Sequence, residues 1–329
     1  MKNKGSIISF ENGEGIFMET EQIIKNIVYN IEKVIIGKRY EVFNIMKGII
    51  ADGHILIEDV PGVGKTTLVK ALAKSLNLSY SRIQFTPDLL PSDITGISIY
   101  NQRTMEFEFR KGPVFANIVL ADEINRTSPK TQSALLEVME EKQVSEGNNT
   151  YKLDKPFFVL ATQNPIESEG TFVLPEAQLD RFMIKVRIGY PEKKEEANIL
   201  KRYRNSEPLT DLTSVADAND ILELQKKCRE VNVTDEINEY IASIADATRN
   251  NKYLILGSST RASLALLRIA QASALINGRD YVIPEDIREN ALLVLGHRVV
   301  VSALARANNF DSESVISDIL KTVAVPKVK

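Results

Sequence analysis

A glycine-rich turn with the spacing of a phosphate-binding loop follows a short apolar run, Ile55-Leu56-Ile57. The turn consists of Asp59, Val60, Pro61, Gly62, Val63, Gly64, Lys65, Thr66 and Thr67. Backbone N–H groups of such a turn, and the positive end of the helix after it, bind phosphate oxygens. Lys65 can reach the β- and γ-phosphates, and the Thr66 hydroxyl can bind Mg²⁺. The segment therefore predicts a site for ATP and its magnesium ion.

The turn departs from the usual pattern at one position. Asp59 stands where the first glycine of G-x-x-x-x-G-K-T is expected. Because Asp tolerates a left-handed backbone better than most residues, we expect the turn to form with Asp59 as a substitute for glycine. On this interpretation Asp59→Gly leaves ATP affinity unchanged or raises it modestly, since it also removes a negative charge near the phosphates.

Two carboxylates end a second apolar run. Asp122 and Glu123 directly follow residues 118–121, and α/β proteins bind ligands at the carboxyl ends of their strands. We expect Asp122 to hold Mg²⁺ through its water shell, and Glu123 to orient and deprotonate the attacking water. An isolated Asp-Glu pair is more often a solvated strand end, but the phosphate-binding loop upstream favours the catalytic interpretation.

Alternating strand and helix patterns surround these motifs. Strands are expected at 54–57, 80–84, 117–120, 156–161 and 182–186, and helices at 65–76 and 129–141. This alternation predicts an α/β fold in which helices sandwich a parallel sheet. Two segments, 96–109 and 144–153, break the rhythm and are interpreted as inserted hairpins.

The two ends of the chain differ from this pattern. Residues 1–17 have no apolar period and are expected to form a flexible tail, so the α/β domain is expected over 18–190. Beyond residue 190 the patterns are helical, at 193–203, 217–231, 235–249, 261–276 and 284–295. They predict an all-α lid domain over 191–329. Cys228 lies on an apolar helical stripe and is interpreted as a buried hydrophobe, not a catalytic thiol.

Composition narrows the class of protein. No apolar run approaches the ~20 residues that cross a bilayer, and no secretory pattern begins the chain. A single cysteine cannot form an intramolecular disulfide, so we expect a cytoplasmic protein. The net charge of −3 argues against bulk binding to nucleic acid. His54 and His297 lack metal-ligand partners at usable spacing and are interpreted as structural.

The two motifs, followed by a helical domain, resemble the AAA+ ATPases and more narrowly the MoxR family of the helix-2-insert clade. The resemblance covers nearly the whole chain after residue 18. The segments that carry it are VIIGK (34–38), EDVPGVGKT (58–66), ADEINR (121–126), ATQNP (161–165), LPEAQLDRF (174–182) and GSSTRA (257–262). Several separate segments in the family's order make the match specific.

The resemblance implies roles for three polar residues. Asn164 looks like sensor 1 beside the γ-phosphate, where the alternative is a plain turn residue. Arg181 looks like the arginine finger that reaches the ATP of a neighbouring subunit; the alternative is a surface pair with Asp180 or Glu176. Arg261 looks like sensor 2, which couples the lid to the nucleotide state.

Further assignments also rest on the resemblance. Ile36 and Gly37 match the segment that walls the adenine pocket. Arg126 is either a second interface arginine or part of a solvated salt bridge, and both interpretations stay open. The hairpins at 96–109 and 144–153 match the helix-2 and pre-sensor insertions, which line the central pore in related motors.

The implied function is an ATPase that couples Mg·ATP hydrolysis to chaperone-like remodelling, assembly, or metal or cofactor insertion of a protein client. A finger that acts in trans implies a ring, expected to be a hexamer, and a von Willebrand factor A-domain protein is a probable partner. One alternative is a chelatase-type or DNA-translocating subunit. The other is a nucleotide-dependent scaffold with slow turnover, which the presence of Glu123, Asn164 and Arg181 disfavours.

Overall fold

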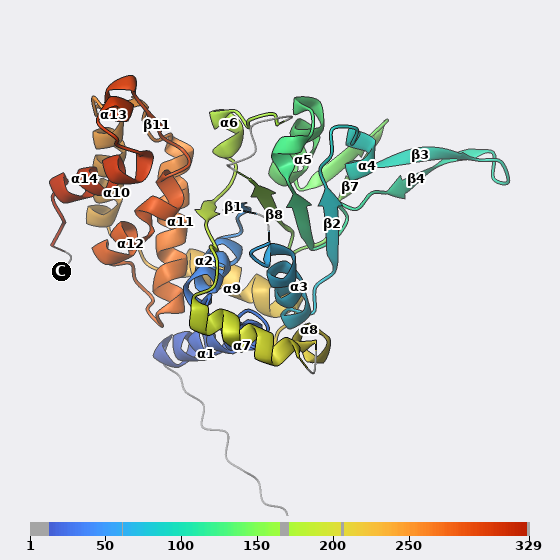
Figure 1. Ribbon diagram of the computed structural model, residues 1–329, viewed down its shortest axis with the longest axis horizontal. Helices are drawn as coiled ribbons and strands as arrows, with labels where there is room; N and C mark the ends of the chain where they lie inside the picture. Colours follow the sequence, from blue (N-terminus) through green and yellow to red (C-terminus); the bar gives the residue numbers. More distant parts are fainter. Residues whose placement is uncertain (1–12, 61, 165–170, 205–206, 328–329) are drawn as a thin grey trace, which may run out of the picture.

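Five parallel strands form the central sheet of the computed structural model, which describes residues 13–60, 62–164, 171–204 and 207–327 (Figure 1). In spatial order the strands are β2 (Tyr80–Gln84), β5 (Ile118–Asp122), β8 (Phe158–Gln163), β1 (Ile55–Glu58) and β9 (Ile184–Val186). All neighbours run parallel, with Leu120 of β5 and Ile55 of β1 both opposite Leu160 of β8. The α/β fold predicted from the sequence is confirmed.

Successive side chains of the central strands bury against opposite faces of the sheet, as the two-residue period of a strand requires. Ile118 and Leu120 of β5 pack with α1 (Gly13–Glu32), α2 (Arg39–Ile50) and α3 (Lys65–Ser75). Val119 and Ala121 pack with α5 (Pro129–Glu141) on the other face. Since both faces are covered, these strands are continuous apolar runs.

The first helix begins earlier than the sequence indicated. α1 starts at Gly13, within the tail expected over 1–17, so that tail was predicted too long. The part of that tail from 1 to 12 lies outside the described residues. Elsewhere the local signals are clear: Pro129 occupies the first turn of α5, and the Ser128 hydroxyl caps it by accepting from Thr131 N–H.

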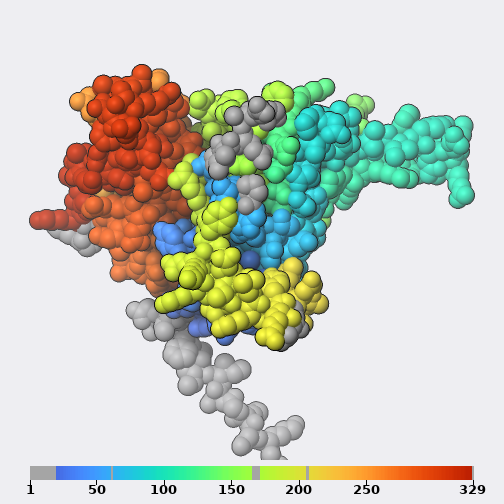
Figure 2. Space-filling model, viewed as in Figure 1, coloured from blue at the N-terminus to red at the C-terminus, as the bar shows by residue number. Residues whose placement is uncertain are grey.

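Hairpins occupy both places where insertions were expected. After α4 (Pro91–Thr95), strands β3 (Gly96–Asn101) and β4 (Glu106–Lys111) form an arm that extends from the body (Figures 1 and 2). Strands β6 (Gln143–Glu146) and β7 (Asn149–Lys152) form the shorter one. Phe109 and Tyr151 stack with ring centroids 4.2 Å apart, so the two hairpins support each other at the base of the arm.

Helices that follow β9 fall into two groups (Figure 1). α7 (Lys193–Tyr203), α8 (Pro208–Asp211) and α9 (Ala218–Glu230) return to the α/β core, where Gln225 donates to Ile49 O (2.9 Å) and Lys74 donates to Leu209 O (2.9 Å). The remaining helices, here called the lid, are α10 (Asp235–Arg249), α11 (Thr260–Ile276), α12 (Pro284–Leu295), α13 (Ala303–Ala307) and α14 (Ser312–Thr322). The helices directly after residue 190 still pack against the α/β core. The expected domain boundary at 190 stays a prediction.

α4, α8, α13 and α14 were not predicted from the sequence, and neither were four further short elements. They are the 3₁₀ helix η1 (Ile124–Arg126), α6 (Glu176–Leu179), and the antiparallel pair β10 (Leu254–Leu256) and β11 (Val300–Val301) inside the lid. Elements of two to four residues are too short to show a period. Within the described ranges, no helix has the length and apolar character needed to cross a membrane.

An ion pair with a buried guanidinium fastens the lid to the sheet edge. The Arg298 guanidinium bonds Asp180 (2.7 Å) and the carbonyl oxygens of Phe182 (2.6 Å) and Met183 (3.0 Å). Burial lowers the pKa of Arg298 to about 10, although Asp180 acts in the opposite direction. The arginine remains charged at neutral pH, so the lid is tied to the residues that lead into β9.

Candidate functional site

The phosphate-binding loop has the backbone that its glycines permit. Gly62 and Gly64 are left-handed, at φ 87° and 85°, and a Cβ added at either would meet no heavy atom within 4 Å. α3 begins at Lys65, so its N-terminus faces the turn. The space is thus open for a phosphate to approach the backbone N–H groups. Pro61 lies outside the described residues.

Strand order brings the other candidate residues to the same edge of the sheet. β8 lies between β1, which leads into the loop, and β5, which ends at Asp122. Because Asn164 follows β8, it lies between the loop and Asp122 along the sheet edge. The residue is 6% exposed. Because parallel strands end at one edge, Lys65, Asp122, Glu123 and Asn164 converge there. Their individual roles stay predictions.

Asp122 is held by two side chains that the sequence analysis missed. Arg82 on β2 donates to Oδ2 from Nη2 (2.7 Å) and Nε (3.1 Å). The Thr162 hydroxyl donates to Oδ1 (2.6 Å). Thr162 lies near the carboxyl end of an apolar strand, and that position was the signal available in the sequence.

Glu123 occupies a left-handed backbone conformation, at φ 58°. Its N–H donates to Thr162 Oγ1 (2.8 Å), and its Oε2 accepts from Gln84 Nε2 (2.9 Å) and Arg126 Nη1 (3.1 Å). Non-glycine residues rarely adopt this conformation, and strained positions concentrate at functional sites. Of the two interpretations of Arg126, the structure shows the salt bridge; the interface role stays a prediction.

The donor set fits a hydrated Mg²⁺ better than direct coordination by several carboxylates. No group of three or more His, Cys, Asp or Glu side chains in the described ranges could hold a metal ion. Magnesium bound with ATP does not need one, because phosphates and waters supply most ligands. Asp122 has about four acceptor directions; Arg82 takes two and Thr162 one, which leaves one for a metal-bound water.

The expected adenine wall lies beside the segment that follows β9. Gly37 is left-handed, at φ 77°, and a Cβ there would overlap the Glu195 side chain of α7. Lys38 Nζ donates to Tyr190 O (3.0 Å). Ile36 and Gly37 therefore lie where the chain turns from the sheet into α7, and their contact with adenine stays a prediction.

Asp59 does not replace a left-handed glycine. Of the described residues in the loop, Gly62 and Gly64 have positive φ and Asp59 does not. Its side chain is 8% exposed and accepts from Val60 N (2.9 Å), Ile188 N (2.7 Å) and Gly189 N (2.6 Å). The expectation from the sequence was wrong, because the carboxylate bonds the segment after β9.

Arg181 and Arg261 lie at the opposite edge of the sheet from the loop. Both line a cavity with Asp52 and His54, which precede β1, whereas the loop follows β1. Arg181 Nη1 donates to Leu136 O (2.7 Å), and Arg261 pairs with Glu140 near the end of α5. Asp180, one of the surface partners considered for Arg181, is engaged by Arg298. Within one chain neither arginine is brought to the loop.

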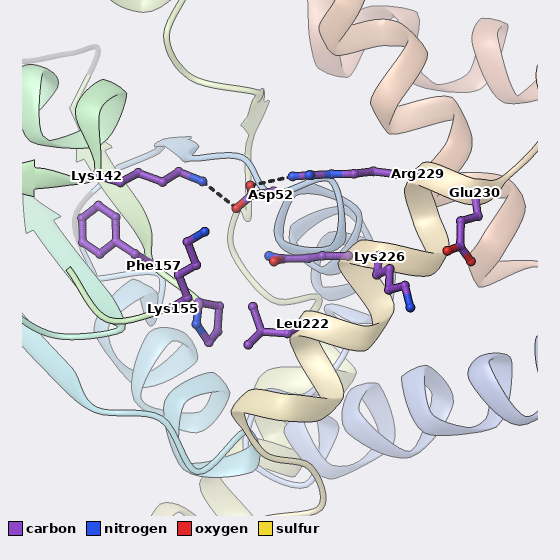
Figure 3. A pocket seen from close by; sticks show the side chains of 10 residues that line it. Asp52, Lys142, Lys155, Phe157, Leu222, Lys226, Arg229 and Glu230 are labelled. Atoms are coloured by element: carbon purple, nitrogen blue, oxygen red, sulfur yellow. Dashed lines mark hydrogen bonds and ion pairs between the residues drawn. The ribbon is translucent and has the colours of Figure 1, made fainter. Parts of the chain in front are cut away.

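A separate cavity of about 290 Å³ opens at that same edge and is not the nucleotide site (Figure 3). Asp52 accepts from both Lys142 (2.8 Å) and Arg229 (3.0 Å) across it. Lys155 and Lys226 add two more cations to its lining. The cavity lies before the strands β1 and β8 begin, so it is separated from Lys65 by the length of the sheet.

The remaining candidates behave as inert core residues. Burial lowers the pKa of His54 to about 4, and its ring nitrogens meet Met139 O and Val159 N, each at 3.0 Å. Burial also lowers the pKa of His297. Burial raises the pKa of Cys228 to about 12, which makes its thiolate inaccessible at neutral pH.

Comparison with known proteins assigns the two parts of the chain. A model described as the ATPase family associated with various cellular activities (AAA) matches residues 54–184, and an AAA lid domain model matches 246–319. Protein YeaC of Bacillus subtilis, an uncharacterized protein, is 52% identical over 299 residues, which cover 91% of this chain and 93% of that protein.

Two further relatives extend the match to nearly the full length. Chaperone MoxR1 of Mycobacterium tuberculosis is 42% identical over 324 residues, which cover 96% of this chain and 85% of that protein. A crystal structure of a Cytophaga hutchinsonii protein matches with a TM-score of 0.89 at 44% identity, over 95% of this chain and 98% of that one. At this level of identity, both sequence and fold are shared.

Proposed function

The chain belongs to the MoxR family of AAA+ ATPases, and we propose that it couples Mg·ATP hydrolysis to chaperone-like remodelling of a protein client. The observation that carries this proposal is the convergence of Lys65, Asn164, Asp122 and Glu123 at one sheet edge. A scaffold that only binds nucleotide needs the loop but not a carboxylate and an amide beside it. Turnover is therefore favoured over a scaffold role.

In the proposed reaction each residue acts at a distinct position. The loop N–H groups and Lys65 hold the phosphates, and Asn164 orients the γ-phosphate and the water. Thr66 and Asp122 would hold Mg²⁺, which neutralises charge on the phosphates when it is bound. Glu123 Oε takes a proton from the attacking water, and Gln84 and Arg126 set the direction of that carboxylate.

The arginines at the opposite edge support assembly into a ring. β1 has four residues, or ~13 Å at ~3.3 Å per residue, so Arg181 and Arg261 begin that far from their own loop. A neighbouring copy that presents this edge to the loop would bring both guanidinium groups to the phosphates. A closed ring satisfies that contact for every subunit, and a hexamer is the size we favour.

The arm offers a surface for the client. Met105 and Phe107 are 70% and 73% exposed, and Ile97, Ile99 and Tyr100 are also exposed along the same hairpin. Exposed apolar side chains on a projecting element favour contact with another protein. We also propose that the protein acts in the cytoplasm with a von Willebrand factor A-domain partner. Its action on the client would include insertion of a metal or cofactor.

Glu123→Gln tests the proposal. The amide cannot take the proton, so we expect ATP binding within a fewfold of wild type and turnover reduced at least ~100-fold. Calorimetry measures binding, and phosphate release measures turnover. Lys65→Ala is the matched control, because it should lose binding and turnover together. Near-normal hydrolysis by Glu123→Gln would show that another group activates the water.

A further inference from the structure

We infer that Asp59 is a positioning residue. It fixes Ile188 and Gly189, which follow β9, against the phosphate-binding loop, and thereby links nucleotide binding to the position of the lid. The inference rests on the nucleotide site proposed above. It concerns the one loop position that departs from the glycine pattern. Asp59 is not proposed to contact the nucleotide.

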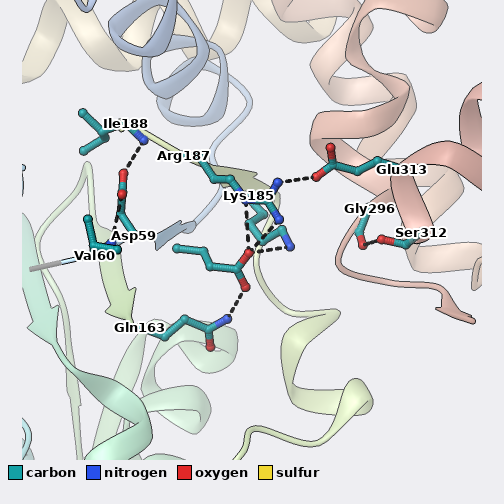
Figure 4. Close-up of polar contacts among 10 residues, drawn as sticks. Asp59, Val60, Gln163, Lys185, Arg187, Ile188, Gly296, Ser312 and Glu313 are labelled. Atoms are coloured by element: carbon teal, nitrogen blue, oxygen red, sulfur yellow. Dashed lines mark hydrogen bonds and ion pairs between the residues drawn. The ribbon is translucent and has the colours of Figure 1, made fainter. Parts of the chain in front are cut away.

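The carboxylate replaces a missing strand partner. β9 pairs with β1 up to Val186 opposite Ile57, after which the chain at β1 turns into the loop. The N–H groups of Ile188 and Gly189 therefore have no β1 backbone to bond. Asp59 Oδ2 accepts from Ile188 N at 2.7 Å (Figure 4) and from Gly189 N at 2.6 Å. Bonds to a charged acceptor are stronger than neutral ones, so this contact holds the segment firmly.

Glu58, the residue before Asp59, extends the connection. Its Oε2 accepts from Lys185 (3.0 Å) and from Arg187 (3.1 Å), and its Oε1 accepts from Gln163 (2.8 Å). Burial acts to raise the pKa of Glu58, but the charge of Lys185 and bonds from Lys185, Gln163 and Arg187 lower it overall. Glu58 is thus a carboxylate anchored to β9 and to Arg187, the residue that follows it.

Arg187 carries the connection to the lid itself. Its Nη1 donates to Glu313 Oε1 of α14 (2.8 Å), while Nε and Nη2 hold Glu58 (Figure 4). Asp59 therefore binds the backbone after β9 directly, and Glu58 reaches α14 through Arg187. A shift of the loop entrance is therefore transmitted to α14 through a chain of direct contacts.

Asp59 also contacts Lys65 and Gln163, and Lys65 is a proposed phosphate ligand. Lys65 Nζ donates to the Asp59 carbonyl (3.0 Å), and Asp59 N donates to Gln163 O (3.2 Å). Gln163 precedes Asn164, the sensor 1 candidate. A phosphate that draws the Lys65 ammonium or the Asn164 amide pulls directly on the residues that hold Ile188 and Gly189. The coupling needs no element beyond these contacts.

Asp59→Gly and Asp59→Asn separate this role from that of a simple turn residue. Glycine restores the consensus loop but removes the acceptor, so the amides of Ile188 and Gly189 should exchange with solvent at least ~10-fold faster. The kcat should fall at least ~10-fold while the ATP dissociation constant changes less than ~3-fold. With its one oxygen toward Ile188 and Gly189, Asn keeps these two bonds and loses only the bond from Val60 N, so Asp59→Asn should recover most of the kcat.

Asp217→Gly is the matched control. Like Asp59 Oδ2, Asp217 Oδ1 accepts from two backbone N–H groups, of Asn219 (2.7 Å) and Asp220 (3.2 Å), at the start of α9. Its loss should speed exchange at those amides and leave kcat unchanged. If the effect came only from the loss of two hydrogen bonds to backbone amides, the kcat of both variants would fall alike.

Hydrogen exchange of the full-length protein with and without Mg·ATP decides the question. In wild type, ATP should change exchange at residues 188–189, and in Asp59→Gly this response should vanish. A wild type that binds ATP without any response there overturns the inference alone. So does an Asp59→Gly protein with wild-type kcat. A wild type that binds no ATP, like Lys65→Ala, overturns the proposed function and the inference together.

Discussion

Mixing two inactive variants tests whether the hydrolytic site is shared between subunits. Arg181→Ala keeps its loop and Glu123 but supplies no finger. Lys65→Ala supplies Arg181 but cannot bind nucleotide productively. Because Arg181 lies before β9 and the loop lies after β1, a chain does not bring Arg181 to its own loop, and the proposed finger must come from a neighbour. Alone, Arg181→Ala should retain ATP binding and lose ~10³–10⁵ in rate.

The recovery on mixing has a definite size. Let f be the fraction of Lys65→Ala subunits in randomly assembled rings. A working site needs an Arg181→Ala subunit next to a Lys65→Ala neighbour on the finger side, with probability f(1−f). Activity per total subunit should therefore follow a parabola that peaks at equal amounts, at about a quarter of the wild-type value, whatever the ring size.

Phosphate release, followed over a full titration, measures the curve, and native mass spectrometry confirms that the variants mix. The control is Arg181→Ala mixed with the double variant Lys65→Ala/Arg181→Ala, which contains no finger and should stay inactive at every ratio. Flat inactivity in the main titration, with mixed rings present, would refute the finger role. It would also remove the main support for a working ring.

Two further predictions concern buried charge. His54 has a pKa near 4 in the folded protein and 6.5 when unfolded, so below pH 6.5 the unfolded chain binds a proton that the native state does not. Its contribution lowers the free energy of unfolding by up to ~1.4 kcal/mol per pH unit between pH 6.5 and 4, and urea titrations of His54→Gln should show a shallower acid slope; an equal slope would contradict the assignment. Arg298→Met removes the buried guanidinium that bonds Asp180 and the carbonyl oxygens of Phe182 and Met183, so the free energy of unfolding in urea should fall by ~1–3 kcal/mol, whereas no measurable loss would mean that these bonds do not fasten the lid.

Local patterns account for the parts of the fold that were predictable. α5 and α10 begin and end where their periodicity indicates, because capping residues and apolar stripes are written in adjacent positions. The start of α1 was missed because its first residues, 13–17, show no periodic apolar pattern. β10 and β11 were missed for the opposite reason: strands of three and two residues depend on tertiary pairing.

The candidate site divides in the same way. The loop and the Asp122-Glu123 pair are short motifs, so the sequence predicts their convergence. The partners of Asp59 lie 129 and 130 residues away, and those of Asp122 lie 40 residues away on either side. No spacing rule connects such positions. The role of Asp59 therefore required the structure, and the motif alone suggested the wrong one.

The position of Arg261 changes how the lid can respond to nucleotide. If a sensor on the lid acted on its own ATP, Arg261 would have to reach the carboxyl edge of the sheet. It pairs instead with Glu140 near the end of α5, beside Arg181. In the proposed ring, Arg261 would be the lid residue that reaches a neighbour's nucleotide. The lid's proposed link to its own nucleotide runs through Arg187 and Glu58, beside Asp59, whose carboxylate fixes Ile188 and Gly189. Each lid would then report on two nucleotides at once, and loss of Asp59 should abolish only the response to its own.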